Sequence, residues 1–200
     1  MLSSWLEYMR RARGLRRIHS PFVYEFARNA LFGTMRPSPE IEKLRRALAR
    51  DKRRIVFDDY GAGMGARGPG RVEATVSELA RRAARRPATG TLLWRIVRYF
   101  APREVLELGT HLGVSAAYIA SALPPEGRLT TVEGAEPLMQ IAQTTLQSLG
   151  LKHKVRFVCA RFEDFLPAAA DLVFIDGGHT AAAMFDRFER IHAPVFVFDD

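Results

Sequence analysis

From residue 103 onward, short apolar runs alternate with longer segments in which apolar residues recur at helical spacing. Alternation of nearly continuous apolar strands with helices is typical of an α/β protein with a parallel sheet covered by helices on both faces. Such a sheet binds its ligand outside the carboxyl ends of its strands. The pattern predicts strands at 103–108, 128–132, 154–159, 171–175 and 194–198, and helices at 113–122, 135–149 and 180–191.

The first ninety or so residues have a different pattern, one that predicts helices and a glycine-rich segment. Ser20-Pro21 is a typical helix start, because serine caps the amino end and proline fits the first turn. A second helix is expected after Pro39. The apolar faces of these two helices consist of Phe22, Val23, Phe26, Ala30 and Leu31, and of Ile41, Leu44 and Leu48; Arg45, Arg46 and Arg50 are expected to point outward.

Residues 55–70 read as a glycine-rich loop that ends without the Gly-Lys-Ser/Thr of a phosphate-binding loop. A lid over the site and a plain connector are both consistent with this composition. Further helices are predicted at 72–86 and 90–100. We therefore divide the chain into an N-terminal helical region, 1–88, and a ligand-binding α/β domain, 89–200.

The most informative motif lies where the first strand of the α/β domain ends, in Glu107-x-Gly109-x-x-x-Gly113. A strand, a glycine turn and a helix start bring backbone N–H groups against a small ligand. His111 lies within this turn and is expected to contribute its backbone rather than its side chain. The spacing differs from the G-x-G-x-x-G of dinucleotide sites. Glu107 stands two residues before the first glycine, so its carboxylate is expected close to the bound ligand. A carboxylate there disfavours phosphates and favours a ligand with positive charge. S-adenosylmethionine carries an ammonium and a sulfonium, so the motif predicts a methyl donor.

A second acid follows at the end of the next predicted strand, in Thr131-Val-Glu133-Gly134. In nucleoside-binding α/β folds an acid at this place accepts hydrogen bonds from the ribose hydroxyls. The alternative interpretation is that both acids cap ordinary strand ends, which would produce the same sequence pattern. The order and spacing of both acids favour a nucleoside site.

Composition narrows the choice of partner and compartment. The net charge is +8, and much of the excess is arginine in the first half of the chain. The positive electrostatic potential of these arginines raises the affinity of the protein for anions, including nucleic acid. The favoured interpretation is nevertheless a basic face exposed to solvent. The single Cys159 is predicted to be a core thiol and fits a reducing cytoplasm. We expect no signal peptide and no membrane span.

The combined motifs resemble those of class I S-adenosylmethionine-dependent methyltransferases with a Rossmann-like fold, over about residues 90–200. The ending Asp176-Gly-Gly-His179 is similar to the small-molecule O-methyltransferase branch. Arg17-Ile-His-Ser-Pro-Phe22 and Asp58-Asp-Tyr-Gly-Ala-Gly63 resemble a bacterial group of unknown substrate. The resemblance implies cofactor contacts from Glu107, Gly109, Thr110, Gly113, Ser115, Glu133, Gly134, Arg161, Phe162 and Asp176. Arg161 departs from the acid or amide that is usual in the family.

Three acids follow the last two predicted strands: Asp176, and the pair Asp199 and Asp200. Oxygen ligands at one rim suit Mg²⁺, and metal-dependent O-methyltransferases place their ligands at these strand ends. The alternative is that Asp176 contacts cofactor or substrate without metal and that the pair caps a strand. His179 is a candidate general base, and a helix-capping histidine is the alternative. Catalytic roles are thus assigned to His179 and Asp176.

The sequence stops at Asp200, directly after the predicted last strand, whereas this superfamily normally adds another helix and two strands. An apolar edge at 194–198 would then need a partner, such as a second copy in a homodimer, unless the chain is a fragment. The leading functional hypothesis is a methyltransferase acting on a hydroxyl of a small molecule. The alternatives are an RNA or protein methyltransferase and a non-catalytic S-adenosylmethionine-binding module.

Overall fold

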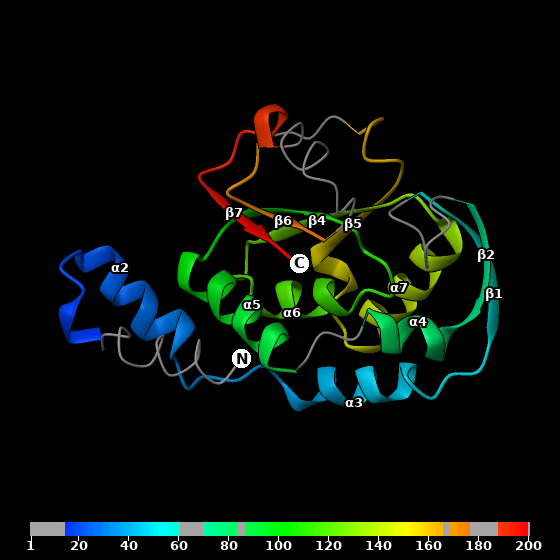
Figure 1. Ribbon diagram of the computed structural model, residues 1–200, viewed down its shortest axis with the longest axis horizontal. Coiled ribbons are helices and arrows are strands. Elements are labelled where there is room, and N and C mark those ends of the chain that lie inside the picture. The colour runs from blue at the N-terminus through cyan, green and yellow to red at the C-terminus, as the bar shows by residue number, and fades with distance from the viewer. Residues whose placement is uncertain (1–14, 61–69, 84–86, 166–168, 177–187, 200) are drawn as a thin grey trace, which may run out of the picture.

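Two sheets organise the chain in a computed structural model that describes residues 15–60, 70–83, 87–165, 169–176 and 188–199. The larger sheet has five strands in the order β5-β4-β3-β6-β7 (Figure 1), all parallel. Its strands are β3 (Glu104–Leu108), β4 (Arg128–Glu133), β5 (Val155–Cys159), β6 (Leu172–Ile175) and β7 (Val195–Phe198). These bounds confirm the predicted strands and the α/β class. The order reverses beside β3, which places the switch point at the glycine turn.

Alternate side chains of the central strands enter two separate cores. Val105, Leu129 and Phe174 face α5 (Pro87–Phe100), α6 (Val114–Ala122) and the end of α7 (Glu136–Ser148). Leu106 and Ile175 face the other way. That opposite face is covered, within the described chain, by the segment 160–165 and by Ile191. The predicted helix 180–191 falls mostly outside the described residues, so cover by helices on both faces stays a prediction.

Helix α6 is buried all round, since it lies between the sheet and α5. Tyr118, Ile119 and Ala120 are all nearly inaccessible to solvent. Gly90 of α5 allows the close crossing: a Cβ there would lie 2.3 Å from the Tyr118 ring. The same core also contains Ala30 and Ile41 from the N-terminal part of the chain. The N-terminal elements therefore share a core with the sheet. The division at residues 88 and 89 stays a prediction.

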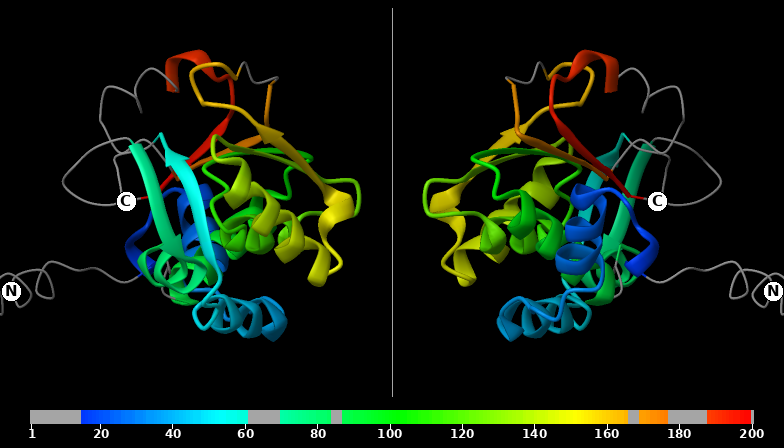
Figure 2. Two further views of the ribbon diagram at one scale, coloured as in Figure 1. Left: turned by 90° about the vertical axis from the view of Figure 1, so that its right-hand side faces the viewer. Right: turned by 90° about the vertical axis from the view of Figure 1, so that its left-hand side faces the viewer.

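Residues before α5 form short helices and a hairpin. They are η1 (Leu15–Arg17), α2 (Pro21–Phe26), η2 (Ala27–Leu31), α3 (Pro39–Leu48), β1 (Arg54–Asp59), β2 (Gly70–Thr75) and α4 (Val76–Arg82). The Ser20 hydroxyl caps α2 by accepting from the Val23 amide at 3.4 Å, as the Ser-Pro pair predicts. Strands β1 and β2 pair antiparallel (Figures 1 and 2).

The hairpin corrects two predictions. The helix expected at 72–86 begins only at Val76, because Thr75 caps it by accepting from the Glu78 amide while Glu78 accepts from the Thr75 amide. The glycine-rich loop expected at 55–70 is strand at both ends. Its middle, 61–69, lies outside the described residues, so the choice between lid and connector stays open.

The predicted apolar face of α2 and η2 is partly exposed: Phe22 is 58% accessible, whereas Ala30 is buried and Phe26 packs against Tyr99 and Phe100. Two predicted orientations are wrong. Arg45 is half-buried, since its Nε donates to Glu42 Oε2 at 3.0 Å. Cys159 is exposed, because it ends an edge strand at the rim of the sheet.

Candidate functional site

The turn between β3 and α6 adopts backbone conformations that its glycines permit. Gly109 has φ 107° and Gly113 has φ 80°. A Cβ at Gly113 would lie 2.9 Å from the Cα of Ala142, so α7 could not pack against the turn with a larger residue there. The turn is tied to the neighbouring strand because the Gly109 amide donates to the Val132 carbonyl at 3.0 Å. The helix start of α6 is thereby fixed above the rim of the sheet.

Glu133 ends β4 beside this turn and is held by the backbone. Its Oε2 accepts from the His111 amide at 2.8 Å, and its Oε1 accepts from the Ala135 amide at 3.0 Å. Burial raises the pKa of the Glu133 carboxyl, and the nearby carboxylate of Asp59 adds to the rise, while the backbone N–H groups oppose it. Each oxygen keeps a further lone pair, so a bound carboxylate here can still accept from hydroxyl groups of a ligand.

Glu107 lies beneath the turn and has no exposed surface. The Thr131 hydroxyl, on the adjacent strand β4, donates to Glu107 Oε2 at 2.5 Å. The hydroxyls of Thr131 and Thr110 are 2.6 Å apart, so a chain of hydrogen bonds runs from the Glu107 carboxylate to the turn. Direct contact of Glu107 with a cofactor stays a prediction. In the structure the carboxylate reaches the turn through these two threonines.

His111 lies at the tip of the turn, where a non-glycine residue rarely adopts its φ of 49°. Burial lowers the pKa of the imidazole to about 4, although the Asp59 carboxylate opposes that shift. The ring is therefore neutral at physiological pH. Its backbone amide holds Glu133, in agreement with the expectation that this residue contributes through its backbone.

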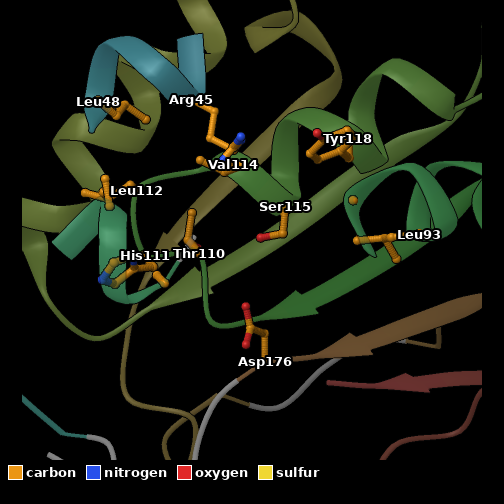
Figure 3. A pocket seen from close by; sticks show the side chains of 13 residues that line it. Arg45, Leu48, Leu93, Thr110, His111, Leu112, Val114, Ser115, Tyr118 and Asp176 are labelled. Atoms are coloured by element: carbon orange, nitrogen blue, oxygen red, sulfur yellow. The ribbon is translucent and has the colours of Figure 1, made fainter. Parts of the chain in front are cut away.

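A narrow pocket of about 40 Å³ opens beside the start of α6 (Figure 3). Thr110, Ser115 and Asp176 form its polar side, with Asp176 directed from the end of β6 toward Ser115. Helices α3, α4 and α5 supply the remaining wall, which includes Arg45 and Leu93. A ligand of more than a few atoms must extend beyond this space. The pocket thus joins the glycine turn to the N-terminal helices.

Asp176 and Asp199 follow the neighbouring strands β6 and β7, as predicted. The Asp176 amide donates to the Leu108 carbonyl at 2.8 Å, and the Asp199 amide donates to the Ile175 carbonyl at 3.0 Å. Asp200 and His179 lie outside the described residues. Within the parts that are described, no three acidic, histidine or cysteine side chains cluster as metal ligands would. The magnesium site and the base assignment stay predictions.

Arg161 and Phe162, two of the expected cofactor contacts, face in different directions. Phe162 is half-buried and packs into the core on the far side of the sheet. The Arg161 guanidinium is exposed and lies 5.4 Å from the ring centroid of Tyr60. Gly134 also meets this ring, since a Cβ there would lie 2.8 Å from Tyr60 Cδ2. Their roles in cofactor binding stay predictions.

Some residues around the site were not predicted. Thr131 is inaccessible to solvent in β4, and a threonine on the same face of the strand as Leu129 was the available signal. Asp59 and Tyr60 reach the site from the hairpin. They belong to the motif Asp58-Asp-Tyr-Gly-Ala-Gly63. The sequence of this motif does not indicate which part of the fold Asp59 and Tyr60 contact.

Comparison with known proteins agrees with this geometry. Residues 106–195 match the family model of a methyltransferase domain. The human Transmembrane O-methyltransferase is 39% identical over 98 residues, which cover 44% of this chain and 34% of that protein. Mouse Catechol O-methyltransferase is 34% identical over 97 residues, covering 44% and 37%. The chain thus spans about a third of the length of these relatives. No helix in the described part of this chain has the length and apolar character of a membrane span.

Solved structures extend the similarity beyond the matched segment. The O-methyltransferase TomG from Streptomyces achromogenes, in complex with SAM, has a TM-score of 0.53 at 28% identity, covering 58% of this chain and 56% of that one. The SAH-bound Podospora anserina methyltransferase PaMTH1 has a TM-score of 0.61 at 12% identity, covering 94% and 73%; it shows the shared fold alone. Together with the glycine turn and the acid after β4, these similarities relate residues 106–195 to methyltransferase domains of the class I S-adenosylmethionine-dependent type.

Proposed function

We propose that this chain transfers the methyl group of S-adenosylmethionine to a hydroxyl group of a small molecule. The observation that carries the proposal is the position of Glu133, which the amides of His111 and Ala135 hold at the end of β4 beside the glycine turn. An acid fixed there favours ribose hydroxyls and disfavours phosphates. When bound, the cofactor supplies an electrophilic methyl on its sulfonium.

The residues present fit such a cofactor. Gly109 and Gly113 permit close approach of a ligand to the backbone, and Thr110 and Ser115 present hydroxyls at the start of α6. Asp176 adds a carboxylate to the same pocket. These groups suit the methionine part of the ligand, whose ammonium pairs with an acid. The likeness to TomG, solved with SAM, supports the assignment.

The acceptor is proposed to enter the pocket from the side of helices α3 to α5, where Arg45 and Leu93 lie. Arg45 is held in place by Glu42, which also accepts a hydrogen bond from the Tyr118 hydroxyl. A fixed guanidinium favours an electron-rich or acidic acceptor. Because methyl transfer is an in-line displacement, holding the acceptor oxygen in line is the main task of this wall.

Activation of the acceptor hydroxyl is assigned to the strand ends. Asp176, Asp199 and Asp200 would hold Mg²⁺, which lowers the pKa of a hydroxyl, and His179 would take the proton. The names of the relatives, which include Catechol O-methyltransferase, support a hydroxyl acceptor. The observed proximity of β6 and β7 supports a common rim for the two described acids.

Transfer of tritiated methyl from S-adenosylmethionine to a panel of catechols and other hydroxylated small molecules tests the proposal. We expect labelled product, stimulation by Mg²⁺ and loss with EDTA. Asp176→Ala should lower the rate by about a hundredfold or more, while Asp164→Ala, on an exposed turn, should not change it. Transfer to RNA or protein but not to small molecules would contradict the proposal, as would tight cofactor binding without any transfer.

A further inference from the structure

The carboxyl end of β1 lies against the loop that follows β4. Tyr60 directly follows β1 and contacts Gly134, because a Cβ at that glycine would overlap its ring at 2.8 Å from Cδ2. Gly134 is the residue after Glu133. The hairpin therefore reaches the place where an acid after β4 holds a ribose, although it precedes that acid by more than seventy residues.

The same ring also reaches the loop that follows β5. The Arg161 guanidinium lies 5.4 Å from the Tyr60 ring centroid. Arg161 is exposed and forms a salt bridge with Glu163 at 3.0 Å. Tyr60 thus bridges the two loops after β4 and β5. About half of the tyrosine surface, 49%, is accessible, so the ring retains area on which a flat molecule can stack.

The position of Tyr60 is fixed by the packing of its hairpin. Phe57, on β1, is 6% exposed and lies in one core cluster with Leu138 and Ile141 of α7. Asp59, which precedes Tyr60, is half-buried, and its carboxylate influences the pKa of both His111 and Glu133. The packing of β1 therefore holds the aromatic ring of Tyr60 beside the loop after β4.

The geometry points to Tyr60 as a nucleoside-binding residue that stacks on the purine of the cofactor. This inference rests on the proposed function, because it assigns the ligand of the same site. Arg161 is the cationic neighbour on the ring. Base–aromatic stacking tolerates different bases because every base has a π-face. The fixed carboxylate of Glu133 would give selectivity against nucleotides that carry phosphates.

Calorimetry with S-adenosylhomocysteine and 5′-methylthioadenosine tests the inference. The second ligand keeps the nucleoside and lacks the amino acid. We expect Tyr60→Ala to weaken both ligands by the same factor, about tenfold or more, because stacking on one aromatic ring typically contributes this much. Tyr60→Phe should bind both ligands as the wild type does. The matched control is Val56→Ala, an exposed position on the same strand.

A second variant gives a readout that a merely structural role of Tyr60 would not produce. Tyr60→Trp should retain binding, and its added indole emission should be quenched by 5′-methylthioadenosine. Wild-type affinity in Tyr60→Ala, or an introduced indole unaffected by saturating ligand, would overturn the inference while leaving the proposed function intact. Absence of binding of either ligand to the wild-type chain would instead overturn both.

Discussion

His111 shows how one residue can serve the site by its backbone while its side chain makes folding sensitive to acid. Its amide positions Glu133, and its positive φ is part of the turn. Sequence alone predicted that this histidine contributes through its backbone, because it lies between two glycines. The depth of the ring was not predictable, since it depends on the hairpin and on α7 packing around the turn.

The buried imidazole predicts an acid-dependent loss of stability. Its pKa is about 4 in the folded chain and 6.5 in the reference state, so between these values the unfolded chain binds a proton that the folded chain excludes. The free energy of unfolding should therefore fall as pH drops from 6.5 toward 4, by about 2 kcal/mol at pH 5. Urea unfolding at several pH values measures this.

His111→Asn is the matched variant for that series, because asparagine tolerates a positive φ and does not titrate. Its unfolding free energy should depend less on pH over the same range. Glu133, whose raised pKa acts in the opposite direction, is present in both proteins and cancels in the comparison. Parallel pH profiles for the two proteins would show that His111 is not the group responsible.

At the scale of elements, the strands, α6 and α7 could be predicted because each carries a local pattern with its own boundaries. The hairpin could not. Residues 70–75 also fit a helical pattern, and only pairing with residues 54–59 makes them a strand. The partly exposed face of α2 has a related explanation: an apolar stripe shows which face can be buried, whereas the partners, here Tyr99 and Phe100, depend on the tertiary fold.

The Thr131 hydroxyl links β4 to β3 beneath the turn, because it donates a hydrogen bond to the Glu107 carboxylate. We expect Thr131→Val to lower the free energy of unfolding by about 1–3 kcal/mol, because a buried carboxylate loses a hydrogen-bond donor without any change in side-chain size. Urea denaturation measures the effect. Thr130→Val is the control, since its half-buried side chain points to the opposite face of the same strand. Equal losses in the two variants would contradict the linking role.

Across the whole molecule, the N-terminal elements and the parallel sheet act as one support for the site. Helices α3 to α5 line the pocket, and the hairpin lies against the loop after β4. The motifs after β3 and β4 located the site in the sequence because strand order makes their ends adjacent. The contribution of residues before 88 was not predictable, because long-range packing determines it. A cofactor site built on the glycine turn and Glu133, with the N-terminal elements around it, is the central claim.

Calorimetric titration with S-adenosylhomocysteine tests this claim most directly, using the wild type, Glu133→Gln and the control Glu136→Gln, an exposed acid at the start of α7. The account predicts one saturable site in the wild type, an affinity about tenfold or more weaker in Glu133→Gln, and no change in the control. No binding at millimolar ligand, or equal affinities for the wild type and Glu133→Gln, would contradict it.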